Sequence, residues 1–357
     1  MAGTAVRLRD IAVTFRSGGG WFGKSAETRA LTSVDLDVRN GETLSIVGES
    51  GSGKSTLGRV ICDLLQPERG EVTIADAAGS RVEAVSSHIQ VVFQDPFSAL
   101  NPRMTIQQLL EEPLIVHRLG GAKQRERRIR ELLEMVGLGA SHLGRYPHEF
   151  SGGQRQRIAI ARAIAIAPKI LLADEPLSAL DVSVQAQIIN LLQDLKNELG
   201  LTLILISHDL SVVGYVSDRI AVMYAGHLVE TGTVDHIFEN SAHPYTRTLL
   251  AAVPRPDLSG RAAFSAILAD HSGPAAEGCA YHRRCPHASD ICRQAAPSLQ
   301  ATDVPDHQAA CHHWRAVIAA PAQIEVTTPA YAERLARYAA QVAALRKTKP
   351  TGEGNQP

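Results

Sequence analysis

The stretch that most constrains this chain is GESGSGKST, which runs from Gly48 to Thr56. It fits the pattern G-x-x-x-x-G-K-[ST], directly follows the apolar run TLSIV, and opens a helical pattern. Its glycines let backbone amides curl around an anion, while Lys54 brings a charge to the phosphates and Ser55 a hydroxyl for Mg²⁺. An incidental Gly/Ser-rich turn is the alternative, but it leaves the register of strand, loop and helix unexplained. The predicted phosphate-binding residues are Gly48, Ser50, Gly51, Ser52, Gly53, Lys54, Ser55 and Thr56.

The first part of the chain, to about residue 235, alternates short apolar runs with longer helical patterns, which is typical of an α/β domain. Near-continuous apolar character predicts buried strands over 43–47, 89–93, 170–174 and 201–207. The pattern of residues 219–232 predicts a hairpin that turns at Ala225 and Gly226. Between the second and third strands, the sequence predicts a mostly helical insert over about residues 101–165. We expect three regions: a nucleotide-binding domain over 1–235, an extension over 236–320, and a tail over 321–357 with an amphipathic helix between Tyr331 and Leu345.

The run ILLADEP supplies a second half for a phosphate site. A carboxylate at the end of a buried strand is costly unless it meets a cation, so Asp174 is expected to meet Mg²⁺ through its water shell. Glu175 is the candidate for orienting and polarising an attacking water. The alternative is that Asp-Glu-Pro simply ends a strand and starts a turn. The presence of the phosphate loop favours the magnesium site over this alternative.

Two more polar residues follow predicted strands. His208 follows the fourth strand, and Gln94 ends the run IQVVFQ. Taken alone, His208 is an ordinary satisfied histidine and Gln94 carries no signal. At strand ends beside a nucleotide, we expect His208 to contact the γ-phosphate or the water, and Gln94 to offer its amide oxygen to Mg²⁺ or water.

A second anion-binding pattern lies about a hundred residues further on, in FSGGQRQRIAIARA from Phe150 to Ala163. A Ser-Gly-Gly turn that opens a helix points both its amides and the positive helix end at a ligand. The alternative is an ordinary helix cap followed by a solvated basic face. The sequence thus poses the question of why one domain carries two such devices.

Bulk composition excludes some functions. The formal net charge of −1 gives no general attraction to nucleic acid. No stretch approaches the ~20 apolar residues that a bilayer span needs, and the N-terminus lacks the apolar core of a signal peptide. We therefore expect a soluble, cytosolic chain that reaches any membrane through a partner.

Four of the five cysteines, Cys279, Cys285, Cys292 and Cys311, are bunched with the spacing C-x5-C-x6-C-x18-C. In a reducing cytosol this favours a metal site over disulfides. Four thiolates can hold a [4Fe–4S] cluster or tetrahedral Zn²⁺, and the absence of C-x2-C pairs makes a zinc ribbon less natural. A purely structural cluster also remains open, and the rival ligands are His282, His287, His312 and His313.

Together these motifs resemble the nucleotide-binding subunit of an ATP-binding cassette (ABC) transporter over the first ~235 residues. GESGSGKST is similar to the Walker A loop, VVFQDP to the Q-loop, FSGGQ to the signature, ILLADEP to Walker B and SALD to the D-loop that ends at Asp181. Phe150 stands where the family commonly has Leu. Phe15 matches the aromatic that stacks on adenine, with Trp21 and Phe22 as competitors. The resemblance implies a P-loop cassette with an antiparallel β subdomain and a helical insert, and it makes His208 the switch histidine.

The resemblance also answers the question of the second anion device. In the family, two cassettes pack head to tail, and the signature of one caps the γ-phosphate of the ATP held by the other. It implies that Ser151, Gly152, Gly153 and Gln154 belong to a neighbour's ATP site. ATP then joins the two halves, and hydrolysis releases them.

The tail resembles the C-terminal extension of the dipeptide/oligopeptide/nickel importer ATPases, through HPYTRTLLAAVP, GCAYHRRCPHASDIC and HQAACHHW. It implies an ATPase at the cytoplasmic face of the inner membrane that drives peptide uptake with two membrane-spanning permease subunits, an extracytoplasmic binding protein and no nucleic acid. LNPRMTIQQLLEEPL looks like the second ATPase of such systems, which implies a paralogous partner cassette. Members with this cysteine pattern are associated with an iron–sulfur cluster. The alternatives are import of nickel or another small solute and, less favoured, a soluble ABC ATPase outside transport.

Overall fold

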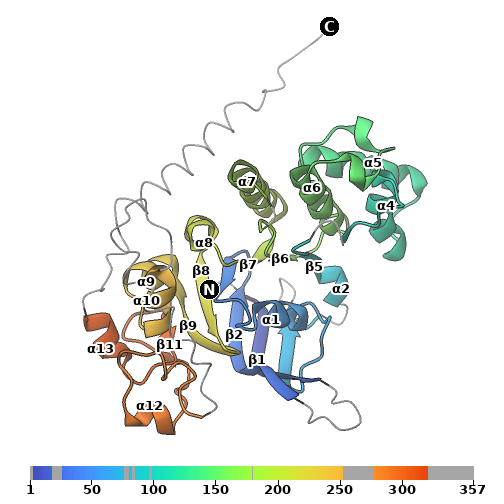
Figure 1. The fold of residues 1–357 in the computed structure, drawn as a ribbon. Coiled ribbons are helices and arrows are strands. Elements are labelled where there is room, and N and C mark those ends of the chain that lie inside the picture. The colour runs from blue at the N-terminus through green and yellow to red at the C-terminus, as the bar shows by residue number, and fades with distance from the viewer. Residues whose placement is uncertain are drawn as a thin grey trace.

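The computed structural model describes residues 3–17, 26–75, 80–82, 85–95, 99–178, 180–251 and 277–320 of the chain. Its main sheet has eight strands in the order β10-β11-β9-β8-β3-β7-β6-β5 (Figure 1). The strands β8, β3, β7, β6 and β5 run parallel, and the remaining pairings in this sheet are antiparallel. Their bounds are β3 Thr43–Val47, β5 Ile89–Val92, β6 Ile170–Asp174, β7 Thr202–Ile206, β8 Arg219–Tyr224, β9 His227–Thr233, β10 Gln300–Ala301 and β11 Gln308–Ala309.

The predicted buried strands are confirmed to within two residues at either end. Both faces of these strands are covered, because alternate residues enter two different cores. Leu171 and Ala173 of β6 pack with the helical side of the molecule, whereas Ile170 and Leu172 pack with α1 (Lys54–Ile61) and the smaller sheet. This two-sided burial explains why the strands read as unbroken apolar runs. The predicted hairpin is confirmed too, with Ala225 and Gly226 between β8 and β9.

A second, antiparallel sheet covers one face of the main sheet, in the order β2-β1-β4. Its strands are β1 Thr4–Ser17, β2 Ala26–Arg39 and β4 Arg69–Ile74. Leu8, Ile11 and Leu36 on these strands are buried against residues of α1 and β3. This is the antiparallel β subdomain that the resemblance implies.

The predicted helical insert is confirmed. Buried apolar residues of its helices join the core on the other face of the main sheet, together with residues of β5, β6 and β7. In Figure 1 α4, α5 and α6 stand together, apart from the smaller sheet. The helices on this side are α4 Ile106–Val116, α5 Ala122–Met135, α6 Gly152–Ala163 and α7 Val182–Leu199, with 3₁₀ turns η1 Ala140–His142 and η2 Pro147–Glu149. The short α2 Val85–His88 precedes β5, and its Val85 packs with the core of α1 and the smaller sheet.

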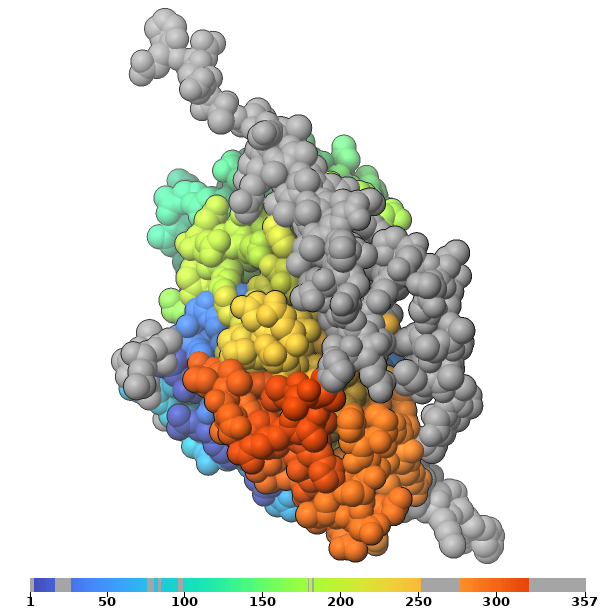
Figure 2. Space-filling model, turned by 90° about the vertical axis from the view of Figure 1, so that its left-hand side faces the viewer, coloured from blue at the N-terminus to red at the C-terminus, as the bar shows by residue number. Residues whose placement is uncertain are grey.

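The extension is joined to the cassette by the sheet itself. Strand β11 pairs with β9, and β10 pairs with β11, so residues after 300 extend the main sheet at one edge. Figure 2 shows the surface of residues 277–320 lying directly against that of α9 and α10. The helices here are α8 Leu210–Val216, α9 Val234–Glu239, α10 Pro244–Ala251, α12 Asp290–Gln294 and α13 Trp314–Ala319.

A buried carboxylate fastens this connection. Glu230 on β9 is fully buried and accepts hydrogen bonds from the backbone N–H groups of Ala242, at 2.6 Å, and His243, at 3.0 Å. The ring of His307, also buried, lies 2.8 Å from the same carboxylate. A buried carboxylate is tolerated when its oxygens are this well satisfied. Glu230 therefore binds β9 both to the segment before α10 and to the loop before β11.

The predicted helix between Tyr331 and Leu345 and the tail after it lie outside the described residues. Within the part that the structure covers, no helix is both long enough and apolar enough to cross a membrane.

His243 makes the stability of this region depend on pH. It is buried, its Nδ1 accepts a hydrogen bond from the N–H of Tyr245, and burial lowers its pKa from 6.5 to about 3. Below pH 6.5 the unfolded chain takes up a proton that the folded chain refuses, so stability falls as the pH drops toward 3. We predict that, because of this residue, the free energy of unfolding decreases by about 2 kcal/mol when the pH is lowered from about 7 to about 5.

Urea unfolding of the wild type and of His243→Asn at the two pH values measures this contribution. Asn keeps an acceptor for Tyr245 but does not titrate, so the loss of stability at the lower pH should shrink in the variant. Equal losses in both proteins would contradict the assignment.

Candidate functional site

The phosphate loop, residues 48–56, connects β3 to α1 as predicted. Gly51 and Gly53 hold left-handed backbone conformations, with φ of 78° and 103°. At Gly53 a Cβ would lie only 2.5 Å from the carbonyl oxygen of Ala30 on β2. The close approach of β2 thus requires glycine at the N-cap of α1.

Lys54 is folded back into this loop. Its Nζ donates to the carbonyl oxygens of Gly48 and Glu49, both at 2.9 Å, and the residue is buried. Burial lowers the pKa of Lys54, and the carboxylates of Glu175, Asp174 and Glu49 act in the opposite direction. The ammonium is therefore already in place at the centre of the loop.

Ser55 and Asp174 meet across the sheet. The Ser55 hydroxyl donates to Oδ1 of Asp174 at 3.1 Å, which joins the start of α1 to the end of β6. Burial raises the pKa of Asp174, and the hydrogen bond from Ser55 partly offsets this. A hydroxyl beside a half-buried carboxylate is the kind of oxygen pair that Mg²⁺ accepts.

Glu175 is held by the two residues predicted to act with it. Its Oε2 accepts a hydrogen bond from Nε2 of Gln94 at 3.1 Å and lies 3.3 Å from Nδ1 of His208. Its own N–H donates to the carbonyl of Ile206, and its φ of 46° turns the chain sharply away from β6. The structure thus brings Gln94, Glu175 and His208 together at the carboxyl ends of β5, β6 and β7.

A small cavity of about 70 Å³ opens beside this carboxylate. Its walls include Glu175, Ser178, Ser207 and His208. It is polar and large enough for ordered water, which needs ~10–15 Å³ of accessible space for each molecule. A water held in this cavity would lie beside Glu175.

The second anion device is built separately. Ser151 is the N-cap of α6, its hydroxyl accepts from the N–H of Gln154 at 3.4 Å, and Gln154 accepts in turn from the N–H of Ser151 at 3.1 Å. Ser151 is exposed, and so is Asp181 at the N-cap of α7. No hydrogen bond or ion pair among the described residues joins Ser151–Gln154 to the phosphate loop. Figure 1 places α6 beside α4 and α5, away from α1.

Gly153 is fixed by packing against α7. A Cβ at this position would lie 2.4 Å from Cγ1 of Val184, whereas one at Gly152 would meet the nearest atom, on Leu180, at 3.4 Å. The two adjacent glycines are therefore not equivalent, since only Gly153 lets the start of α6 approach α7.

Phe15, on β1, has 45% of its surface exposed and is accessible to a flat ring. Trp21 and Phe22, its competitors in the sequence analysis, lie outside the described residues.

The four-cysteine metal site is not supported. All four thiols are free, and burial raises the pKa of Cys279, of Cys285 to about 11 and of Cys311 to about 12, with neighbouring cysteines adding to the effect. The sulfurs thus share one small region. However, no group of three or more His, Cys, Asp or Glu side chains in the described ranges is arranged to hold a metal ion.

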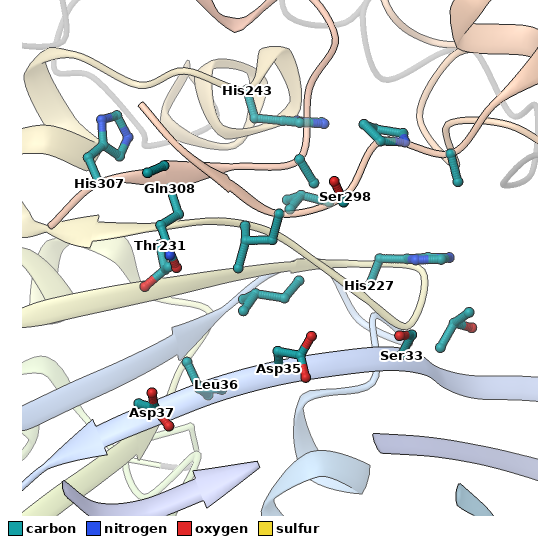
Figure 3. Close-up of a pocket in the computed structure, with 18 of the residues that line it drawn as sticks. Ser33, Asp35, Leu36, Asp37, His227, Thr231, His243, Ser298, His307 and Gln308 are labelled. Atoms are coloured by element: carbon teal, nitrogen blue, oxygen red, sulfur yellow. The ribbon is translucent and has the colours of Figure 1, made fainter. Parts of the chain in front are cut away.

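A cavity of about 840 Å³ lies elsewhere, between β2, the β8–β9 hairpin and the extension (Figure 3). Its labelled walls include Asp35 on one side and His307 and Gln308 on the other. Each arginine in its walls already pairs with a carboxylate: Arg9 with Asp37, Arg39 with Asp306, and Arg219 with Glu42. Despite its size, this cavity therefore lacks the features of the phosphate loop.

Sequence reasoning missed two contacts to the phosphate loop. Arg284 of the extension pairs with the Glu49 carboxylate at 3.2 and 3.3 Å, and the Tyr245 hydroxyl accepts a hydrogen bond from the Glu49 N–H at 2.8 Å. These residues are separated by 235 and 196 positions, and no local pattern links them.

Comparison with known proteins yields two family matches. Residues 31–178 match the family described as "ABC transporter", and residues 229–292 match "Oligopeptide/dipeptide transporter, C-terminal region". The chain is 43% identical over 320 residues to the oligopeptide transport ATP-binding protein AppF of Bacillus subtilis (strain 168), covering 87% of this chain and 97% of AppF. It is 42% identical over 321 residues to the di/tripeptide transport ATP-binding protein DppF of Pseudomonas aeruginosa (strain UCBPP-PA14), covering 87% and 98%.

A solved structure supports the same fold. The ATP-binding cassette MJ0796, in a dimeric post-hydrolysis state bound to ADP and Pi, matches with a TM-score of 0.56 and 34% identity. The match covers 64% of this chain and 98% of MJ0796.

The difference between the two glycines of α6 can be tested. We predict that Gly153→Ala destabilises the protein by about 1–3 kcal/mol, because its methyl group overlaps Val184. Gly152→Ala is the matched control, since alanine there makes only an ordinary contact with Leu180, at 3.4 Å, and favours the helix. Thermal unfolding measures both, and Gly153→Ala combined with Val184→Ala should cost less than the sum of the single changes. Equal stability of the two alanine variants would contradict the packing argument.

Proposed function

The chain belongs to the ATP-binding proteins of ABC transporters, in the oligopeptide/dipeptide group, and from this premise we propose that it hydrolyses ATP to drive peptide import. The observation that carries the proposal is the meeting of Lys54, Ser55, Asp174 and Glu175 in one site, with Gln94 and His208 on the Glu175 carboxylate. Each of these residues lies at a strand end or in the loop that follows β3.

Hydrolysis requires that a water be aimed at the γ-phosphate. Glu175 is the proposed group that orients and polarises this water, because its carboxylate borders the small cavity and is only 18% exposed. Gln94 and His208 hold the carboxylate from two sides. Lys54 neutralises charge on the β- and γ-phosphates, and the amides of residues 50–56 enclose them.

Mg²⁺ fits the oxygen atoms already present. Ser55, Asp174 and Gln94 are the proposed holders, since the hydroxyl and carboxylate are within hydrogen-bonding distance. The ion bound with ATP supplies charge neutralisation at the phosphate oxygens.

The signature residues serve a second ATP in this proposal. Ser151 is exposed at the start of α6 and is not bonded to the chain's own loop, so its helix end is available to a phosphate on another cassette. Exposed Asp181, at the N-cap of α7, is proposed to contact that cassette, and Phe15 to stack on adenine. We propose a paralogous cassette as the partner.

The permease subunits are proposed to dock at the helical insert. Large apolar side chains are exposed there and beside Gln94, where a soluble monomer gains nothing from them. They are Phe93 (43% exposed), Ile115 (53%), Val116 (70%) and Leu119 (42%). We propose that the chain lies at the cytoplasmic face of the membrane and that an extracytoplasmic protein delivers the peptide.

We retain two further proposals from the sequence. The first divides the chain into a cassette over 1–235, an extension over 236–320 and a tail over 321–357. The second assigns a [4Fe–4S] cluster, or alternatively Zn²⁺, to the four cysteines. It is supported by four free thiols in one region, and it requires their side chains to rearrange on binding.

The role of Glu175 gives the main test. We predict that Glu175→Gln slows ATP turnover in the assembled transporter by about 100-fold or more, while ATP binding is kept. Because ATP then persists between the two cassettes, the ATP-bound pair should accumulate. Steady-state ATPase assays and size-exclusion chromatography with light scattering measure the two effects.

Glu198→Gln is the matched control, since Glu198 is an exposed carboxylate on α7. Full activity of Glu175→Gln would contradict the assigned role. Equal turnover by the isolated monomer and the assembled complex would contradict the shared site.

The metal proposal is tested on anaerobically purified full-length protein. A [4Fe–4S] cluster predicts about four iron and four sulfide per chain with absorbance in the visible, whereas zinc predicts one colourless ion. Cys292→Ser should lower the metal content and Cys62→Ser, outside the extension, should not. Metal-free wild type with full activity would overturn the proposal.

A further inference from the structure

The extension contacts the phosphate loop at Glu49. This residue follows the first glycine of the loop, and three of its groups are bonded. Its N–H donates to the Tyr245 hydroxyl at 2.8 Å, its carbonyl oxygen accepts from Lys54 at 2.9 Å, and its carboxylate pairs with Arg284 at 3.2 and 3.3 Å. Two of these three contacts come from beyond residue 235.

The groups that hold Glu49 are themselves rigidly packed. Tyr245 and Tyr281 are almost fully buried, and their rings contact each other and that of Tyr224, with centroids 4.6 to 5.5 Å apart. The Arg284 guanidinium lies 5.9 Å from the ring centroid of Tyr224 and 5.6 Å from that of Tyr281, and its side chain is only 12% exposed. An arginine confined between aromatic rings loses little freedom on forming a two-point contact with a carboxylate.

The negative charge of Glu49 links its contact with Arg284 to nucleotide binding. The Glu49 carboxylate acts electrostatically on the Lys54 ammonium, so it also lies within range of the phosphates that Lys54 receives. An unpaired carboxylate there would repel a triphosphate, and since the Glu49 side chain is 38% exposed, water and salt screen part of this repulsion. Arg284 cancels it.

We propose that Arg284 and Tyr245 are positioning residues for ATP binding, which neutralise Glu49 and fix the first turn of the phosphate loop. The extension thereby sets the affinity of the cassette for ATP. This inference rests on the proposed function, because it concerns the same nucleotide site.

The test compares Arg284→Gln with the wild type by calorimetric titration of Mg·ATP into the full-length chain. We expect the dissociation constant to rise about fivefold or more, within the usual range of coupling between sites. Arg283→Gln is the matched control, because Arg283 is the exposed neighbour in the same turn. In the assembled transporter, Arg284→Gln should raise KM for ATP and leave kcat near the wild-type value.

A double variant tests whether Arg284 acts by neutralising the charge of Glu49. Glu49→Gln removes the carboxylate that Arg284 neutralises, so the double variant Glu49→Gln/Arg284→Gln should bind ATP more tightly than Arg284→Gln alone. Tyr245→Phe removes only the acceptor for the Glu49 N–H, so Glu49→Gln should not rescue it. A merely structural role of Arg284 predicts no rescue in either case.

The outcomes separate the two levels of the proposal. Wild type that binds no ATP, like Lys54→Ala, would refute the proposed function. Wild type that binds ATP, with Arg284→Gln binding equally well or with no rescue by Glu49→Gln, would overturn the inference and leave the proposed function intact.

Discussion

The carboxylate of Asp174 is the constraint around which the cassette is built. It ends a buried parallel strand, burial raises its pKa, and the side chain in contact with it is the Ser55 hydroxyl of the phosphate loop. Such a group is stable only where positive charge or hydroxyl donors reach it. The order β3-β7-β6 brings the loop after β3 to the end of β6, and Lys54 is near enough to act on the carboxylate.

The fold also keeps the two anion-binding motifs, the phosphate loop and the signature, apart. The phosphate loop follows β3 near the middle of the sheet, whereas Ser151 begins a helix that packs on α7 through Gly153. Since both pieces are held by rigid packing, the chain has no simple way to close its own signature over its own loop. In the proposed function a second cassette supplies the signature that the fold keeps apart from the loop, and ATP bound between the two contributes binding energy that hydrolysis removes.

Much of this arrangement could be predicted from the sequence, for identifiable reasons. The strands β3, β6 and β7 are buried on both faces, so their apolar runs were visible, and the residues at their ends followed from the parallel topology. In the smaller sheet the period-two signal is clear in β2, where Val34, Leu36 and Val38 are buried and alternate with Asp35 and Asp37. In β1 the alternation is interrupted by register shifts against β2 and by a left-handed residue at Asp10. Strands β10 and β11 have two residues each and could not be recognised without the partner strand β9.

The contact of Arg284 with Glu49 belongs to a different class of feature. Neither residue carries a local signature, and their meeting depends on how the extension docks through Glu230, His243 and Tyr245. By linkage, a docked extension that strengthens ATP binding must itself be stabilised by ATP to the same degree. The segment before α10 is thus bonded to Glu230 at one end and to the phosphate loop at the other. A displacement of the extension would therefore change the contacts of Glu49 in the phosphate loop directly.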